Sequence, residues 1–508
     1  MAQEVFMRGM FSVACRLIAS VVFAILTSMR SEATADSADR PAGVECVVFK
    51  SLDTNLRVAR QVVPVGRKFH VYHVERVQGD WIWLVAEYEN LKGWAKRLEV
   101  VPLDKATAYL TEVLKNDPGK AETYYHRGRT RSANGDNVHA IADFSEAIQL
   151  DSAFAAAYAD RGYSRFTLKD FEAARKDFDV AIRIAPKSAE ALKLRGYFFE
   201  STGMLEQANA DYTEAITLDP TCAKLYFNRA YVLKRLSKDD DLILADYKAG
   251  FQLDPQSAMA QSNRGMFWKE KKDYKRALQD ICEAIRIDPK TAAFYLNRAE
   301  VRKELKDYVG AIEDCDEALR LSPELGVVYL ARASARRKKG DLDLALDDYS
   351  EAIQRAPEYR AFVYYDRSGA WLSKQNYDHL FSDLEEAARL ETRLTPFADM
   401  MRAWVWATAP DPRIRDGRKA VAAALRVSTR AKELTDYNET VVPLILAVAY
   451  AESGDFNSAV LWQHQAIAGF RKEGRDCRTF EQMLKVFEDK KPYHCGTSPI
   501  WCETLGLK

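Results

Sequence analysis

Small residues recur along the middle of the chain with a spacing of 34 residues, as at Gly128, Gly162 and Gly196. Each lies in a stretch whose apolar positions have helical spacing, and a second such stretch follows after a polar turn. Each interval therefore predicts a pair of helices. One helix pair cannot bury its own apolar face, so the pattern predicts a stack of pairs. The small positions of the first helices are Gly128, Gly162, Gly196, Ala230, Gly265, Ala299 and Ala333.

The second half of each interval carries an alanine, and a proline closes most intervals, where it cannot continue a helix. The alanines are Ala147, Ala181, Ala215, Ala284, Ala318 and Ala352, and the prolines are Pro186, Pro220, Pro255, Pro289, Pro323 and Pro357. This pattern resembles the tetratricopeptide repeat (TPR) family over eight units, from Ala121 to about Thr392. The resemblance implies a mainly α fold, in which helix pairs form a right-handed solenoid.

An arginine precedes the small position of every first helix, and an aspartate recurs in every second helix. The arginines are Arg127, Arg161, Arg195, Arg229, Arg264, Arg298, Arg332 and Arg367, and the aspartates are Asp143, Asp177, Asp211, Asp246, Asp280, Asp314, Asp348 and Asp383. They form either a ladder of ion pairs between the two helices or a stripe of arginines that binds anions. The equal number of aspartates at a fixed offset favours the ladder.

The family resemblance implies that the first helix of each unit lines a concave face, to which its second, fifth, sixth, ninth and twelfth positions point. The ninth positions of successive units include three tyrosines and a methionine, and three successive sixth positions are asparagines. Such side chains suit adaptable contact with a peptide. Alternatively, the tyrosines pack between units as core. The candidate partner-binding residues are Tyr163, Tyr197, Tyr231, Met266, Phe227, Asn228, Asn263 and Asn297.

Residues 45–102 have a different pattern, in which short runs of β-forming residues alternate with glycine-containing turns. This predicts five short strands in a small β-barrel. The turn 79–81 (Gly-Asp-Trp) and the pair Gly93-Trp94 resemble a bacterial Src-homology-3-like (SH3-like) barrel. The resemblance implies binding of cell-wall peptides or proline-rich ligands. Trp81 and Trp83 share one face of a strand and are the candidate ligand face, unless one of them belongs to the core.

The segments beside these domains complete the predicted organisation. Residues 1–35 predict a signal peptide, from the apolar run 17–27 and the small-residue cleavage site 33–35, and a linker follows at 36–44. The alternative is an uncleaved membrane anchor. Cleavage would place the protein in the periplasm or cell envelope. Residues 103–120 predict a half-repeat that caps the solenoid.

Residues 393–470 resemble the terminal TPR-like module of secreted planctomycete-type repeat proteins, in which an SH3-like barrel also precedes the repeats. A polar tail is predicted at 471–508. Cys477, Cys495 and Cys502 could form one disulfide there, whereas Cys282 and Cys315 occupy apolar helix positions and are expected in the core.

Composition and motifs limit the function classes. The 508 residues include 74 Lys and Arg and 74 Asp and Glu, so the basic excess of a general nucleic-acid binder is absent. The sequence has no Walker loop, no GxSxG, no HExxH and no CxxC. We therefore predict no cofactor, no metal and no enzymatic activity.

These features predict an exported, non-enzymatic scaffold that binds a partner peptide or helix in the concave TPR groove. The alternative is a cell-wall or envelope adaptor that acts through the SH3-like barrel. An enzyme with an unrecognised site is the third hypothesis.

Overall fold

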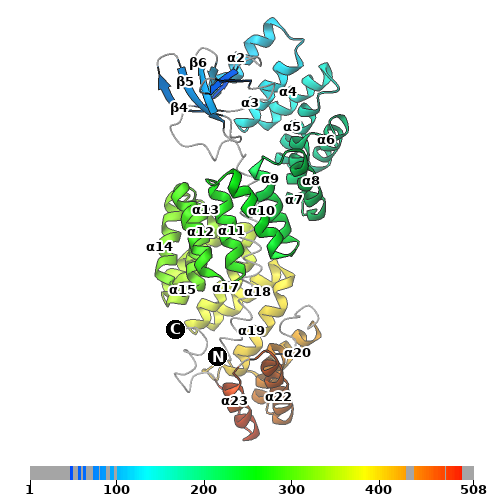
Figure 1. The fold of residues 1–508 in the computed structure, drawn as a ribbon. Helices are drawn as coiled ribbons and strands as arrows, with labels where there is room; N and C mark the ends of the chain where they lie inside the picture. Colours follow the sequence, from blue (N-terminus) through cyan, green and yellow to red (C-terminus); the bar gives the residue numbers. More distant parts are fainter. Residues whose placement is uncertain are drawn as a thin grey trace. The chain divides into compact units, whose positions relative to one another are not determined.

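The computed structural model describes residues 46–49, 55–58, 61–64, 72–78, 81–86, 92–96, 100–430, 440–474 and 476–494 (Figure 1). The chain forms two compact units, and the boundary between them falls between Asn263 and Arg264. The predicted signal peptide, the linker and the end of the tail lie outside the described residues. No helix among the described residues is long and apolar enough to cross a membrane.

The first unit begins with an antiparallel sheet of seven strands in the order β3-β2-β6-β5-β4-β1-β7. Five strands were predicted, and short strands account for the difference, because β7 has only 3 residues and cannot show a period. The strands are β1 (Cys46–Phe49), β2 (Asn55–Val58), β3 (Gln61–Pro64), β4 (Tyr72–Gln78), β5 (Trp81–Ala86), β6 (Lys92–Lys96) and β7 (Val100–Pro102).

Helix α2 (Leu103–Asn116) follows β7 without a loop. Its residues Leu103 and Ala106 are buried in one cluster with Val101 of β7 and with Tyr125 of the next helix. The half-repeat segment thus contacts both the sheet and the first helix pair.

Eight helix pairs occupy Ala121–Leu390, and both helices of each pair have 13 or 14 residues. The mainly helical TPR-like solenoid predicted from the 34-residue spacing is present. The pairs are α3 (Ala121–Ala133) and α4 (Asn137–Leu150), α5 (Ala155–Thr167) and α6 (Phe171–Ile184), α7 (Ala189–Ser201) and α8 (Leu205–Leu218), α9 (Ala223–Arg235) and α10 (Asp240–Leu253), α11 (Ala258–Glu270) and α12 (Tyr274–Ile287), α13 (Ala292–Glu304) and α14 (Tyr308–Leu321), α15 (Gly326–Lys339) and α16 (Leu342–Arg355), and α17 (Arg360–Ser373) and α18 (Tyr377–Leu390).

The small positions let the two helices of a pair approach closely. A Cβ atom on Gly196 of α7 would lie 2.8 Å from the ring of Tyr212 in α8, and one on Gly128 of α3 would lie 2.7 Å from Phe144 in α4. A larger residue would therefore push the pair apart. The turn between the helices needs a left-handed residue, which is Gly340 after α15 (φ 102°) but Lys306 after α13 (φ 63°).

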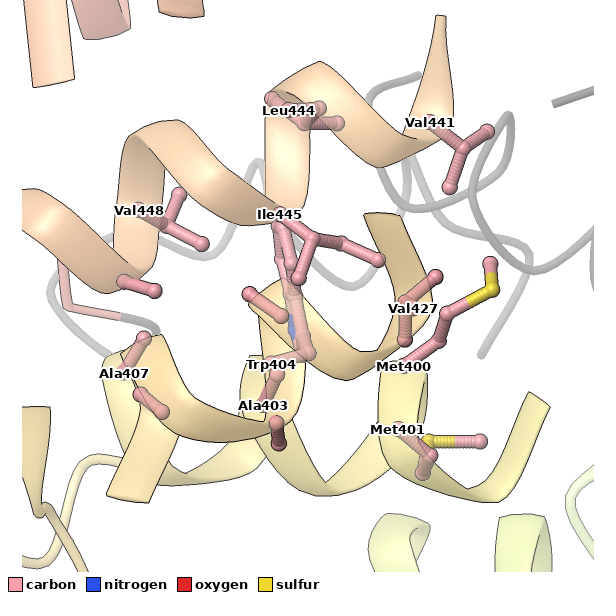
Figure 2. Packing of buried hydrophobic residues seen from close by; sticks show 14 of the residues in the cluster. Met400, Met401, Ala403, Trp404, Ala407, Val427, Val441, Leu444, Ile445 and Val448 are labelled. Carbon is pink, nitrogen blue, oxygen red and sulfur yellow. The ribbon is translucent and has the colours of Figure 1, made fainter. Parts of the chain in front are cut away.

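The second unit ends in helices that share one large apolar core. They are α19 (Thr395–Thr408), α20 (Gly417–Thr429), α21 (Val441–Ser453), α22 (Phe456–Lys472) and α23 (Arg478–Glu488), and short 3₁₀ turns lie at η2 (Pro357–Tyr359) and η3 (Thr392–Leu394). Figure 2 shows Ile445 of α21 facing Trp404 of α19, and both side chains are almost fully buried. Every residue from Val441 to Ala449 is buried, so α21 is the central helix of this core.

The segment predicted as a polar tail contains α23, whose Phe480, Met483 and Phe487 are buried. The ring of Phe480 stacks on Phe470 of α22 at 4.3 Å between centroids. Gln463 of α22 donates a 2.8 Å hydrogen bond from Nε2 to the carbonyl oxygen of Phe480. Helix α23 therefore covers one side of the apolar core. The prediction of a polar tail missed it because that prediction considered the overall polarity of the segment and not the spacing of its apolar residues.

The described cysteines differ in their surroundings. Cys315 is buried, as expected, whereas Cys282 is exposed and the prediction that it is a core residue is wrong. Its helix face carries the arginine ladder rather than the apolar core. Cys477 is a buried free thiol, and its two possible disulfide partners, Cys495 and Cys502, lie outside the described residues.

Candidate functional site

Tyr163 of α5 and Tyr197 of α7 lie side by side at equivalent positions of neighbouring units. Their ring centroids are 6.4 Å apart, and both residues are partly exposed. Beneath them, Phe166 is 6% exposed and meets Tyr197 edge to face at 5.8 Å. Phe166 in turn contacts the buried Phe198 at 5.8 Å. The two tyrosines thus form an aromatic surface on a packed aromatic base.

Sequence reasoning missed Phe166 as the support of this surface. It lies three residues after Tyr163, which places both on one face of α5. That spacing was the available signal.

Three other candidates are buried. Tyr231 is 3% exposed, Asn297 is 2% exposed, and Phe227 is 7% exposed. Phe227 packs 4.9 Å from Phe251, measured between ring centroids. For these three residues burial favours the packing alternative, and their contact with a partner stays a prediction.

The remaining candidates are partly exposed. Asn228 lies 3.5 Å from the hydroxyl of Tyr212, which itself donates to Glu200 at 2.9 Å. Asn263 and Met266 lie in α11 on either side of the boundary between the two units. Met266 also packs against the apolar cluster around Ile281.

Charged groups lie near Tyr163 and Tyr197 in the first compact unit. Arg129 stands one unit before Tyr163 at the equivalent position, and its Nη1 donates to Asp160 at 3.0 Å. The hydroxyl of Tyr125 donates to the same carboxylate at 2.8 Å. Burial raises the pKa of Asp160, although the guanidinium of Arg129 acts in the opposite direction. These contacts hold the partly exposed guanidinium of Arg129 as a polar border beside the aromatic surface.

In the second compact unit, which contains the repeats from Arg264 on, Glu300 occupies the position equivalent to Tyr163 and Tyr197. It lies between Lys269 of α11 and Lys303 of α13, with Nζ–O distances of 3.3 and 2.7 Å. Burial alone would raise the pKa of Glu300, but the two ammonium groups lower it to about 2. The aromatic row therefore gives way to a charged cluster in this unit.

All eight predicted ladder pairs are present, so the prediction of an ion-pair ladder is confirmed. In Arg195–Asp211 the guanidinium forms two hydrogen bonds of 2.8 Å, one from Nε and one from Nη2, and the aspartate side chain is only 6% exposed. Because every ladder guanidinium already has a carboxylate partner, the arrangement does not favour an anion-binding stripe. The pairs are Arg127–Asp143, Arg161–Asp177, Arg195–Asp211, Arg229–Asp246, Arg264–Asp280, Arg298–Asp314, Arg332–Asp348 and Arg367–Asp383.

The ladder arginines also contact the preceding unit, which the sequence pattern did not predict. In seven of the ladder arginines Nη1 approaches a side chain 16 or 17 residues earlier, such as Ser145 from Arg161 at 3.1 Å. The contacted residues are Thr111, Ser145, Asp179, Thr213, Cys282, Asp316 and Ser350. The ladder therefore joins helices within a pair and also joins successive pairs.

Trp81 and Trp83 both lie in β5, where their backbones pair with Lys96 and Trp94 of β6. Their side chains lie outside the described part of the structure, so the predicted ligand face stays a prediction. Within the described ranges, no group of three or more His, Cys, Asp or Glu residues is placed to hold a metal ion.

Comparison with known families identifies the repeats. A family described as tetratricopeptide repeat matches residues 125–189, 159–223 and 273–325, and a second family of the same description matches 327–359. These matches and the helix pairs together show that the chain contains tetratricopeptide repeats.

Solved structures with a similar fold include that of pilF from Pseudomonas aeruginosa. It has 23% identity and a TM-score of 0.36, and the similarity covers 40% of this chain and 92% of that chain. Yeast Tom70 has 16% identity and a TM-score of 0.41, with 79% and 95% covered. YrrB, described as a TPR protein with an unusual peptide-binding site, has 22% identity and a TM-score of 0.30, with 36% and 95% covered. Comparison with curated proteins gives no match.

Proposed function

We propose that the chain is an exported, non-enzymatic scaffold that binds a segment of a partner protein through the surface around Tyr163 and Tyr197. Tetratricopeptide repeats are typical of protein–protein interaction, and stacked repeats offer extended surfaces for it. The observation that supports this site is the partly exposed tyrosine pair on its buried aromatic base.

The chemistry of this surface suits a peptide. A tyrosine offers an apolar ring and a hydroxyl, and few side-chain torsions must be fixed on binding. Phe166 holds the ring of Tyr197 in place, which lowers the cost of ordering it. An extended strand or a helix of the partner would lay apolar side chains on the rings and hydrogen-bond to the polar border.

Export is the second part of the proposal. It is supported by the apolar run 17–27 and by the small residues at 33–35. The uncleaved anchor is the alternative, and N-terminal sequencing of the protein from its host distinguishes them. A mature N-terminus near residue 36 supports cleavage, and an intact N-terminus contradicts it.

The binding site is tested with the double substitution Tyr163→Ala/Tyr197→Ala. Crosslinking capture from envelope extract identifies a partner of the parent chain, and binding of that purified partner is then measured with each variant. We expect at least a tenfold loss of affinity, because two central aromatic contacts are removed. Val309→Ala is the matched control, since Val309 is 56% exposed on α14 and apolar.

Equal helical content by circular dichroism shows that the variants are folded. If the double variant binds as tightly as the parent, the tyrosine surface is not the site. Retained binding that is lost on Trp81→Ala/Trp83→Ala would instead favour the envelope adaptor, which acts through the predicted barrel.

A further inference from the structure

Near the end of the described residues, His494, Glu452 and Arg415 form a polar cluster on the last helices of the second compact unit, and we call this cluster the clasp. His494 lies 2.6 Å from Glu452 Oε2, measured from Nε2. Arg415 donates from Nε to the other oxygen of Glu452 at 3.1 Å. Glu452 itself is near the C-terminus of α21. The clasp fixes the point from which residues 495–508 continue.

An aromatic shelf lies close to this clasp. It consists of Trp406 of α19 and Phe381 of α18, whose rings stack at 5.4 Å between centroids. Both residues are partly exposed. The ammonium group of Lys419 is 6.0 Å from the centroid of the Trp406 ring. The shelf therefore combines an apolar surface with an ammonium group, which also lies 3.4 Å from Asp416 Oδ2.

Two short contacts connect the clasp to the shelf. A Cβ atom on Gly417 would lie 2.7 Å from the backbone carbon of Glu452, so the start of α20 touches the end of α21. The neighbouring Asp416 donates its backbone N–H to the carbonyl oxygen of Trp406 at 2.9 Å. Trp501 follows His494 by seven residues, which span up to about 25 Å when extended. That length is enough to reach the shelf from the clasp.

We infer that residues 495–508 of the same chain dock on the Trp406–Phe381 shelf, with Trp501 against the Trp406 ring and Glu503 beside Lys419. The segment carries Pro499, Ile500 and Trp501 together, and the acidic Glu503 comes two residues later. An indole stacked on an aromatic pair matches the shelf, and the carboxylate matches the cation. Because the segment is tethered at His494, its effective concentration near the shelf is in the millimolar range, so a weak contact suffices.

The test is zero-length carbodiimide crosslinking of the full chain, followed by peptide mass spectrometry. We expect an amide between Glu503 and Lys419. The exposed pair Lys374–Asp343 serves as the positive control for the reaction. Trp501→Ala should reduce the Glu503–Lys419 product at least fivefold, and Thr497→Ala, in the same segment, should leave it unchanged. Neither variant alters a described helix, so both are expected to fold.

An equal mixture of isotopically light and heavy chains separates contacts within a chain from contacts between chains. Crosslinks that pair only light with light and heavy with heavy support docking within one chain. Mixed products would show that a second copy receives the segment, which overturns the inference. It is also overturned if Glu503 couples only to Lys490 or Lys491 while the Lys374–Asp343 control forms.

Discussion

The ring of Phe227 occupies the space that a Cβ atom on Gly250 would need, since that atom would lie only 2.3 Å from the Phe227 ring. Gly250 stands where the seven other units carry an alanine, and Phe227 is a large aromatic residue at a position that is Ala159 two units earlier. In the fourth unit the missing Cβ atom of Gly250 therefore leaves room for the ring of Phe227. Phe227 belongs to this packing pair and is buried by it.

Gly250→Ala is expected to destabilise the chain by about 1–2 kcal/mol, because overpacking outweighs the higher helix propensity of alanine. Phe227→Leu creates room, so the double variant should recover a large part of the loss. Chemical denaturation followed by circular dichroism measures the four stabilities of the cycle. Additive effects of the two substitutions would show that the pair is not coupled.

Arg195→Met is expected to cost about 3 kcal/mol, because it leaves the carboxylate of Asp211 buried without its ladder partner. Arg161→Met should cost clearly less, since Arg165 still contacts Asp177 at 2.7 Å. The position equivalent to Arg165 in the next unit is Phe199, so Asp211 lacks that support. Thermal and denaturant unfolding of both variants provide the comparison, and equal losses would contradict the role of the second arginine.

Lys306→Gly is expected to stabilise the chain by up to about 1 kcal/mol. Lys306 has a φ of 63°, a left-handed conformation that costs a residue with a Cβ about 1–2 kcal/mol, and glycine avoids this cost. Lys306→Ala is the matched control, because alanine keeps the strain while it removes the same charge. A gain in the alanine variant that equals the gain in the glycine variant would assign the effect to charge instead.

The free energy of unfolding should decrease as the pH is lowered from 6.5 to 4, because the unfolded chain binds a proton at His126 more readily than the folded chain does. Burial, followed by the guanidinium of Arg129, lowers the pKa of His126 from 6.5 to about 4. The unfolded chain therefore binds a proton in this window that the folded chain does not, so stability present above pH 6.5 is lost as the pH falls to about 4. The contribution is at most about 3 kcal/mol.

Other groups also titrate in that window, so the measurement compares the parent with His126→Gln. The difference between their unfolding free energies should change between pH 7 and pH 4 and stay constant above pH 7. A constant difference over the whole range would exclude His126 as the cause.

The helix pairs and their contacts followed from the sequence because they depend on periodic positions. Each ladder arginine and its aspartate recur at a fixed offset, so one structural rule applied to all units. The seven contacts to preceding units had no such signal, since the acceptors include Ser145, Asp179 and Cys282. Different side chains accept the contact from a ladder arginine at this position. A search for a residue type that recurs in every repeat therefore does not find these acceptors.

The candidate site was predicted only in part, for a related reason. Tyr163 and Tyr231 occupy equivalent positions, yet Tyr163 is partly exposed and Tyr231 is 3% exposed. Neighbours from other units decide this difference, and their sizes vary independently of the repeat. Periodicity therefore locates a row of side chains but does not determine which of them remain accessible.

The ladder arginines contact partners on both sides along the chain, and this affects how the number of repeats can change. Seven of the ladder arginines approach one partner about sixteen residues before them and another about sixteen residues after them, and these two offsets together nearly equal one repeat. Duplication or loss of a whole repeat in the gene would therefore bring an aspartate partner back into register, whereas the side chain contacted in the preceding repeat differs from one repeat to another. The one-residue insertion between Arg229 and Asp246 was tolerated because it lies in the exposed turn between them, and the ion pair still forms at 2.7 Å.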